Sequence, residues 1–303
     1  MISLAGKVAV ITGAGRGLGR SYALHLAERG VMVVVNDLGV ALDGSGKDSS
    51  PAQQVVDEIR AKGGQAVANN SDVTSEAGAA SIIAQAMESF GNLQIVINNA
   101  GICRDLPFEQ TSLADFELNF RIHVAGHYNV SKAAWPILKD QQYGRVIMTG
   151  SGAGVFGLKN ETAYSMAKGA IYGLTRTLAL EGEEHGILVN AVLPGGVSRM
   201  HEEAFPDPAV LQMMRDFMPP ELVAPAVAWL ASENCNVSGQ AWSVWAGRVS
   251  RLVVGSGAGY FNRALTAEEI DSNIAAITSA DGLFEPRDGI DDAQHWQKIL
   301  MGG

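Results

Sequence analysis

Cysteine and clustered positive charge are both scarce in this sequence. Its two cysteines, Cys103 and Cys235, do not form a CxxC pair, so we interpret them as buried or incidental thiols in a reducing compartment. The formal net charge is −10, and lysine and arginine nowhere form a run. A field of that sign repels nucleic acid and anionic lipid, so neither is an expected partner.

Long hydrophobic runs are also missing. The apolar stretch 8–11 is far too short for a signal peptide or a membrane-spanning helix. The C-terminal Met301-Gly302-Gly303 is not a peroxisomal targeting signal. We therefore expect no membrane insertion and a cytoplasmic location.

The composition is that of a globular protein with a large core. Of the 303 residues, 47% are hydrophobic and 18% are charged, which is enough apolar material for one large α/β domain. Short apolar runs alternate with amphipathic stretches of helical length, and this alternation is typical of βαβ units. It predicts a doubly wound, Rossmann-type fold, with a seven-stranded parallel sheet and helices on both faces. The predicted strands are 7–12, 31–36, 65–68, 93–97, 145–149, 187–193 and 241–245.

The predicted helices lie between these strands, at 17–29, 51–61, 75–90, 112–138, 162–185 and 222–231. Pro136 should bend or end the long helix over 112–138. Residues 195–220 show no clear helical or strand periodicity of hydrophobic residues, but they are rich in methionine and phenylalanine. We predict one Rossmann-type domain over 1–247. A C-terminal extension over 248–303, with one helix at 266–276, should pack on the same domain or on its neighbour in an oligomer.

A glycine-rich turn, Thr12–Gly19, separates the first predicted strand from the first helix. Glycine lets the backbone approach a pyrophosphate closely, and a helix N-terminus offers free N–H groups and a positive dipole end. A tight βα turn alone could also explain the glycines, but the strand–turn–helix context favours a dinucleotide site. The residues expected to contact the cofactor here are Gly13, Arg16, Gly17, Leu18 and Gly19.

An acidic residue, Asp37, follows the second predicted strand. A carboxylate at this place can accept both adenosine ribose hydroxyls and would repel a 2′-phosphate, which favours NAD over NADP. Arg16 favours NADP instead, because a basic side chain in the turn could contact a 2′-phosphate. Alternatively, Arg16 is a solvated turn residue. We give Asp37 the greater weight, since its position is tied more directly to the ribose.

Tyr164 and Lys168 are four residues apart in a predicted helix, so both project from one face. A free phenol has a pKa near 10, and a nearby ammonium favours its phenolate form. The phenol could then exchange a proton with an alcohol as hydride leaves or reaches carbon. Ser151, at the end of the fifth strand, could orient the substrate oxygen. The plainer alternative for Tyr164 is an ordinary tyrosine–lysine pair on a helix surface.

These stretches together resemble the short-chain dehydrogenase/reductase family over nearly the first 245 residues. The matching motifs are Thr12–Gly19, Asp72-Val73, Asn98-Asn99-Ala100-Gly101, Ser151, Tyr164–Lys168 and Pro194-Gly195. The resemblance implies the same catalytic roles and adds that Lys168 holds the nicotinamide ribose, that Asp72 and Val73 flank adenine, and that Asn98 and Gly101 line the cofactor cleft. The further cofactor contacts that it implies are Asn99, Ala100, Pro194, Gly195 and Val197. Asn98 and Asn99 could otherwise be simple turn formers.

Two positions depart from the family pattern. Many members carry an asparagine that completes a proton relay, three residues before a glycine of the long helix. Here His123 holds that place, ahead of Gly126, and Asn119 lies one turn earlier. His123 either replaces the relay as a catalytic residue or is an interior helix residue. A threonine of the family often hydrogen-bonds the carboxamide of the cofactor, but Arg199 holds its position here. Ser198 could make that hydrogen bond instead.

The departures resemble one subgroup, the (3R)-hydroxyacyl-CoA dehydrogenase domain of peroxisomal multifunctional enzyme type 2, also called 17β-hydroxysteroid dehydrogenase type 4. The leading hypothesis is therefore NAD-dependent oxidation of a (3R)-hydroxyacyl-CoA or a closely similar secondary alcohol. Arg104 and Lys159 are either cationic contacts for the CoA or ordinary surface charges. A hydroxysteroid dehydrogenase is the second hypothesis, and a non-catalytic dinucleotide-binding protein is the third. No metal site is expected. Helices 112–138 and 162–185 resemble those that pair subunits in this family, which implies a homodimer or homotetramer.

Overall fold

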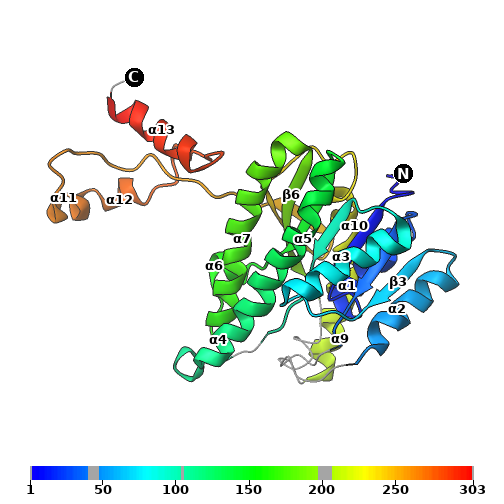
Figure 1. The fold of residues 1–303 in the computed structure, drawn as a ribbon. Coiled ribbons are helices and arrows are strands. Elements are labelled where there is room, and N and C mark those ends of the chain that lie inside the picture. Colours follow the sequence, from blue (N-terminus) through cyan, green and yellow to red (C-terminus); the bar gives the residue numbers. More distant parts are fainter. Residues whose placement is uncertain (1, 40–47, 104–105, 197–206, 302–303) are drawn as a thin grey trace. The chain divides into compact units, whose positions relative to one another are not determined.

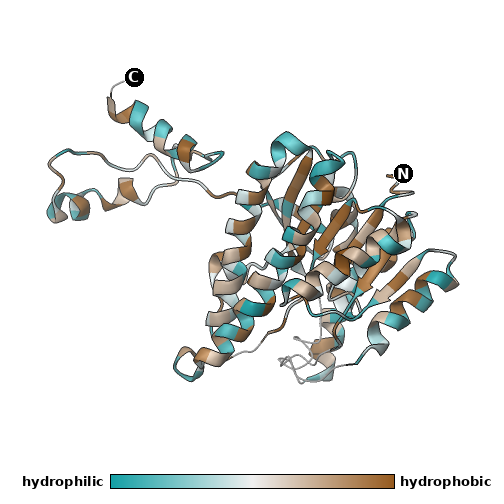
Figure 2. Cartoon of the chain, viewed as in Figure 1, coloured by the Kyte–Doolittle hydropathy of each residue, from teal (hydrophilic) through white to brown (hydrophobic). Residues whose placement is uncertain are grey.

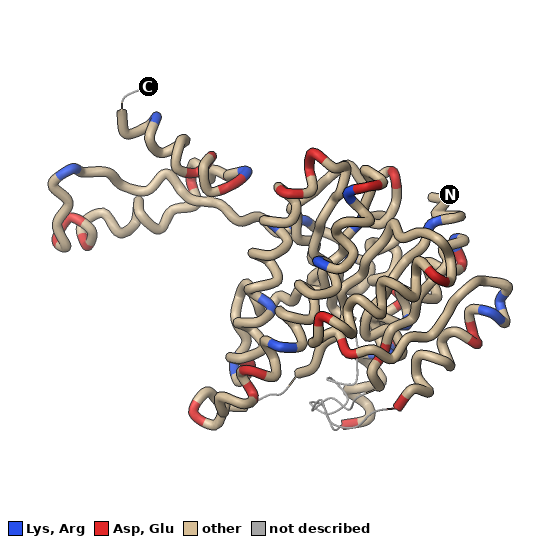
Figure 3. Tube along the Cα trace, viewed as in Figure 1, with Lys and Arg blue, Asp and Glu red and all other residues tan. Residues whose placement is uncertain are grey.

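The computed structural model describes residues 2–39, 48–103, 106–196 and 207–301. Contacts between residues divide the chain into two compact units, Met1–Arg251 and Leu252–Gly303. In the described part of the chain, no helix is both long enough and apolar enough to cross a membrane. Acidic and basic residues are interspersed over the first unit (Figure 3).

The first unit is built on one eight-stranded sheet of order β3-β2-β1-β4-β5-β6-β7-β8. Seven strands are parallel, so the predicted doubly wound sheet is confirmed. Every residue of β1 and β4 is buried, and these strands are strongly hydrophobic in Figure 2, as expected of a parallel sheet covered on both faces. The strands are β1 (Val8–Thr12), β2 (Met32–Asn36), β3 (Ala66–Asn69), β4 (Ile95–Asn98), β5 (Gly144–Thr149), β6 (Ile187–Gly195), β7 (Ala241–Trp245) and β8 (Arg248–Arg251).

The eighth strand was not predicted. β8 pairs antiparallel with β7 from Trp245 opposite Arg248, and the loop between them has only two residues. These are Ala246 and Gly247, with φ values of +46° and +81°, the sign that a tight hairpin turn needs at both positions. The strand Arg-Val-Ser-Arg carries two charges and no apolar run, as edge strands often do, so the hydrophobic pattern did not reveal it.

Helices cover both faces of this sheet (Figure 1). In one layer α1 (Gly17–Ala27) packs against α2 (Ser50–Ala61) and α10 (Ala224–Leu230), and in the other α5 (Gly126–Asp140) packs against α3 (Glu76–Phe90) and α7 (Thr162–Gly182). Shorter helical segments are η1 (Phe108–Gln110), α6 (Ala153–Phe156), η3 (Glu183–His185), α9 (Pro208–Phe217) and η4 (Pro220–Leu222). The strand order reverses between β1 and β4, the point where ligands bind in such sheets.

The helix predicted over 112–138 is divided into three parts. α4 (Leu113–Asn119) begins at a capping box formed by Ser112 and Asp115. It is followed by a π-helical turn, η2 (Phe120–Ala125), and then by α5. Pro136 lies inside α5 and does not end it. The irregularity lies instead at the turn that carries His123, and π turns are frequent at functional sites.

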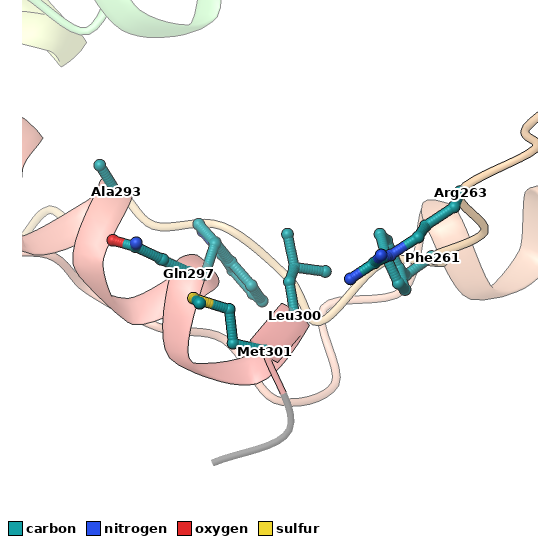
Figure 4. Close-up of a pocket in the computed structure, with 7 residues that line it drawn as sticks. Phe261, Arg263, Ala293, Gln297, Leu300 and Met301 are labelled. Carbon is teal, nitrogen blue, oxygen red and sulfur yellow. The ribbon is translucent and has the colours of Figure 1, made fainter.

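The second unit contains α11 (Ala267–Ser272), α12 (Ile274–Ile277) and α13 (Gly289–Met301). The predicted helix 266–276 is two short helices that meet at Asn273, and α13 was not predicted. A ring stack of Phe284 on His295, with centroids 3.7 Å apart, ties α13 to the preceding loop. α13 and the segment before α11 line an open pocket of about 450 Å³ (Figure 4). How this extension packs against the first unit or a neighbour stays a prediction.

Candidate active site

The turn after β1 is shaped by its glycines. Gly13 and Gly17 have φ values of +61° and +53°, a left-handed region that glycine enters without steric cost. A Cβ on Gly13 would lie 2.8 Å from the Cα of Ala100, and one on Gly19 would lie 2.3 Å from the Gly13 carbonyl oxygen. A Cβ on Gly17 would meet nothing within 4 Å. The turn is therefore packed on its inner side and open beyond Gly17, which fits a dinucleotide pyrophosphate at the start of α1.

Residues after β4 hold this turn in place. Asn99 Nδ2 donates to the carbonyl oxygens of Thr12 and the following glycine at 3.1 and 3.0 Å. Thr12 Oγ1 accepts from the backbone N–H groups of Asn99 and Ala100 at 3.0 and 3.1 Å. The Asn98 side chain is fully buried and donates to Ser131 Oγ at 2.9 Å. Of the two neighbouring asparagines, Asn99 is thus the one that contacts the glycine turn.

A carboxylate is fixed beside the same turn at the end of β2. Asp37 Oδ2 accepts from the Gly15 N–H at 2.8 Å, and Oδ1 accepts from the Gly39 N–H at 2.7 Å. A Cβ on Gly15 would lie 2.8 Å from Asp37 Oδ2, so only glycine permits this approach. The predicted neighbour Arg16 forms an ion pair with Asp48, with 3.8 Å between Nη2 and Oδ2.

The residues predicted to flank adenine follow β3. Asp72 accepts from the Thr74 N–H at 2.8 Å and thereby shapes its own turn. Val73 is buried, and its carbonyl oxygen accepts from Asn129 Nδ2 at 3.2 Å. Both residues follow a strand that pairs with β2, so they lie near the edge where Asp37 is found. Their contact with a cofactor stays a prediction.

Pro194 and Gly195 are the last two residues of β6. A Cβ on Gly195 would lie 2.1 Å from Trp245 Cδ2, so this glycine lets β6 and β7 pack closely. Leu18 lies against the next residue, Gly196, where a Cβ would be 3.2 Å from Leu18 Cδ2. Other predicted contacts fall outside the described residues: Arg104, Val197, Ser198 and Arg199.

Three of the four predicted catalytic residues are carried by α7 or follow β5: Tyr164, Lys168 and Ser151. Lys168 and Tyr164 come from the same face of α7, and Lys168 Nζ lies 5.5 Å from the centroid of the Tyr164 ring. Lys168 Nζ also donates to the carbonyl oxygen of Thr149, the last residue of β5, at 2.7 Å. Ser151 follows two residues later, and its Oγ accepts from the Ala153 N–H at 3.1 Å. Lys168 thus links α7, which also carries Tyr164, to the end of β5, two residues before Ser151.

Lys168 is only 5% exposed. Burial disfavours the charged ammonium and lowers the pKa of Lys168 to about 7, and the nearby Cys103 opposes this shift by favouring the charged form. A lysine whose pKa lies near neutral pH can change its charge in the working range of an enzyme. Such perturbed groups cluster at functional sites.

His123 lies beside the predicted proton donor. Its ring meets the Tyr164 ring edge to face, with centroids 5.3 Å apart, and its Nε2 lies 2.8 Å from the Ile102 carbonyl oxygen. Nε2 also lies 3.3 Å from the Ile102 backbone nitrogen. Burial and the charge of Lys168 lower the pKa of His123 well below its usual value. Asn119 is also buried, but its Nδ2 donates to the Asp115 carbonyl oxygen one turn earlier. His123 therefore contacts Tyr164 directly.

A model of the short chain dehydrogenase family matches residues 7–208. The chain belongs to this family. The oxidoreductase activity of the family agrees with the fold and with the residues gathered at the end of β5.

Three similar proteins place the chain within the family. A short-chain type dehydrogenase/reductase of Mycobacterium tuberculosis is 43% identical over 91% of this chain and 95% of its own length. Peroxisomal multifunctional enzyme type 2 of Mus musculus is 42% identical over 93% of this chain, but the matched part is only 38% of the mouse enzyme. A solved structure of 7α-hydroxysteroid dehydrogenase with NADH and 7-oxo glycochenodeoxycholic acid is 31% identical, with a TM-score of 0.72 over 81% of this chain and 95% of that one.

Several residues of this dehydrogenase site were not identified from sequence. Thr149 and Ile102 contribute only backbone atoms, which no side-chain motif reveals. His127 is fully buried one turn after His123, and burial and the charge of Lys168 lower its pKa as well. The spacing of four residues between His123 and His127 was the available signal, since it places both on one helical face.

Gly101 is required by the position of His123. A Cβ on Gly101 would lie 2.4 Å from His123 Cε1, so Gly101→Ala should displace the imidazole and disturb its contact with Tyr164. We expect kcat/KM to fall about tenfold and the protein to lose about 1–3 kcal/mol of stability, as overpacked sites do. Steady-state kinetics and urea unfolding measure both effects.

The matched control is Gly173→Ala on α7, where a Cβ meets nothing within 4 Å. It should leave kcat/KM unchanged, because alanine suits an exposed helix position. Equal activity of Gly101→Ala and the control would show that the placement of His123 does not matter for turnover.

Proposed function

We propose that the chain is an NAD-dependent dehydrogenase that oxidises a (3R)-hydroxyacyl-CoA, or a closely similar secondary alcohol, to its ketone. The observation that carries the proposal is the position of Lys168 beside the Tyr164 ring. The Lys168 ammonium is held there by a hydrogen bond to the carbonyl oxygen of Thr149, two residues before Ser151 in the chain. These contacts support a site in which a phenol, an ammonium and a hydroxyl act together after β5.

In this proposal each side chain acts on the substrate oxygen or its proton. Ser151 Oγ donates a hydrogen bond to that oxygen, and Tyr164 accepts the hydroxyl proton as the carbonyl forms. Before this step Tyr164 must be a phenolate, which the ammonium form of Lys168 stabilises, and accepting the proton converts it to the neutral phenol. His123 keeps the ring in place through its edge contact. A bound nicotinamide dinucleotide supplies the hydride acceptor. In the reverse direction Tyr164 returns the proton to the alcohol oxygen.

The fixed carboxylate of Asp37 supports NAD as the preferred cofactor. Both of its oxygens already accept backbone hydrogen bonds, so its negative charge stays beside the turn where the adenosine ribose would bind. A 2′-phosphate placed there would be repelled, whereas two ribose hydroxyls would be accepted.

The substrate proposal is supported by exposed apolar side chains in two segments of the first unit. The segment between Ser151 and Tyr164 exposes the apolar side chains of Phe156 and Leu158, 76% and 58% exposed, directly before the exposed Lys159. Helix α9 likewise exposes Met213 and Phe217. Apolar and methionine-rich surfaces adapt to flexible chains, and a lysine suits the phosphates of an acyl-CoA. The similarity to peroxisomal multifunctional enzyme type 2 agrees with this proposal.

A hydroxysteroid substrate is the second candidate, favoured by the similarity to 7α-hydroxysteroid dehydrogenase. Turnover of (3R)-hydroxyacyl-CoA thioesters and of 17β- and 7α-hydroxysteroids should be compared with NAD and with NADP. We expect at least 100-fold higher kcat/KM for the thioester with NAD. Activity on steroids alone would remove the acyl-CoA assignment, and a preference for NADP would remove the cofactor assignment.

Assembly and location stay predictions. An apolar groove lined by Phe120, Arg121, Val124, Ala125, Tyr128 and Leu174 lies between η2, α5 and α7. These are the helices predicted to pair subunits, which supports a homo-oligomer. We keep the cytoplasmic location as a proposal, although the mouse relative is named as peroxisomal.

A further inference from the structure

The glycine turn carries one charged residue that the proposed function does not use. Arg16 lies between Gly15, whose N–H binds Asp37, and Gly17, which borders the open side of the turn. A guanidinium at this place is suited to a 2′-phosphate, which would favour NADP and so oppose Asp37. In this structure, however, Arg16 already has an acidic partner, Asp48, at 3.8 Å.

Asp48 is itself held in a fixed position. Its Oδ1 accepts from the Ser50 N–H at 2.9 Å, and its Oδ2 accepts from Ser50 Oγ at 2.8 Å. These bonds, together with the charge of Arg16, lower the pKa of Asp48, so it is charged at neutral pH. A Cβ on Gly39 would lie 1.6 Å from the Asp48 carbonyl oxygen, which shows how closely the Asp48 backbone packs on Gly39.

Gly39 also connects the two acidic residues. Its N–H donates to Asp37 Oδ1 at 2.7 Å, while Asp48 packs against its α-carbon. Asp37 and Asp48 thus contact two consecutive residues of the glycine turn, Gly15 and Arg16. Asp37 lies where the adenosine ribose of the proposed cofactor would bind. Asp48 forms an ion pair with the nearby Arg16 guanidinium.

The ion pair has little value for stability. Both side chains are partly exposed, 38% for Arg16 and 51% for Asp48, and exposed pairs contribute little to folding. Its consequence lies instead in the charge that an incoming cofactor meets. With Asp48 present, the charge of the Arg16 guanidinium is balanced by a paired carboxylate, so it is less available to a phosphate on the adenosine ribose.

We infer that Asp48 is a specificity-determining residue, which favours NAD by pairing with Arg16 and withholding it from a 2′-phosphate. This inference rests on the proposed preference for NAD. It predicts that the chain already contains a cationic group suited to NADP, and that one substitution at Asp48 releases it.

The test compares four proteins: wild type, Asp48→Asn, Arg16→Ala and the double variant. For each, the Kd of NAD and of NADP is measured by titration calorimetry, and kcat/KM is measured with both cofactors. We expect Asp48→Asn to raise the NADP-to-NAD ratio about tenfold and to leave the Kd of NAD within about twofold. In the Arg16→Ala background the same substitution should change the ratio by less than twofold, because no guanidinium is left to release.

A matched control is Glu58→Gln, which breaks the ion pair of Arg20 with Glu58 at 2.6 Å, one turn further along α1. It should leave the ratio unchanged. An equal rise for Asp48→Asn with and without Arg16 would overturn the inference, because Asp48 would then act through its own charge. No rise in either background would overturn it as well. A wild type that prefers NADP would instead contradict the proposed cofactor, whatever the variants show.

Discussion

Replacing Tyr164 with phenylalanine is expected to lower kcat/KM about 10³-fold, within the range that general acid–base catalysis contributes. The substitution removes only the hydroxyl, so the ring can keep its edge contact with His123 and its place beside Lys168. The Kd of NAD should therefore stay within about threefold. Single-turnover hydride transfer, followed by NADH absorbance, separates this loss of chemistry from a change in binding.

Tyr172→Phe is the matched control for this prediction. Tyr172 lies on the same helix, α7, two turns further along and partly buried, and no role in the site is assigned to it. It should keep full activity and the same Tm. If Tyr164→Phe were as active as this control, proton transfer by the phenol would be wrong and the proposed mechanism would fail with it.

Much of this site could be predicted because its residues follow strands. Parallel strands end at one edge of the sheet, so residues after β1, β2, β4 and β5 had to approach one another once the strands were recognised. The apolar runs that marked those strands are buried on both faces, which is why they stand out in sequence. The pairing of Tyr164 with Lys168 followed from helical geometry alone.

The parts that were missed depend on contacts that no local pattern encodes. The π turn that carries His123 contacts α7, which is distant in sequence, whereas the local sequence is typical of one continuous helix. The ion pair of Arg16 with Asp48 joins the glycine turn to a residue just before α2, across a segment that reads only as a loop. β8 depends on a two-residue hairpin in which alanine takes a positive φ.

Replacing Lys168 with methionine is expected to lower kcat/KM about 100-fold and to change how stability depends on pH. Methionine fills a similar volume without charge, so the phenolate of Tyr164 loses the ammonium that stabilises it. Initial rates at saturating NAD and at pH 7 measure the loss. The control is Lys62→Met, at an exposed lysine that ends α2 and has no proposed role in the site; it should keep kcat/KM within threefold.

The stability effect follows from where Lys168 releases its proton. Its pKa is about 7 in the folded protein because of burial, but about 10.4 in the unfolded chain. Between these values the unfolded chain binds more protons, so Lys168 makes the free energy of unfolding rise with pH, by about 1.4 kcal/mol per pH unit. Below pH 7 both states hold the proton, and the buried charge destabilises the folded protein by a constant amount.

In the cofactor-free protein, the unfolding free energy of wild type minus that of Lys168→Met should therefore rise by about 2 kcal/mol from pH 7.5 to 9 in urea titrations. A difference that stays flat over this range would mean that Lys168 remains charged in the folded protein, and the ammonium would then be a permanent partner of Tyr164 instead of a group that titrates with it.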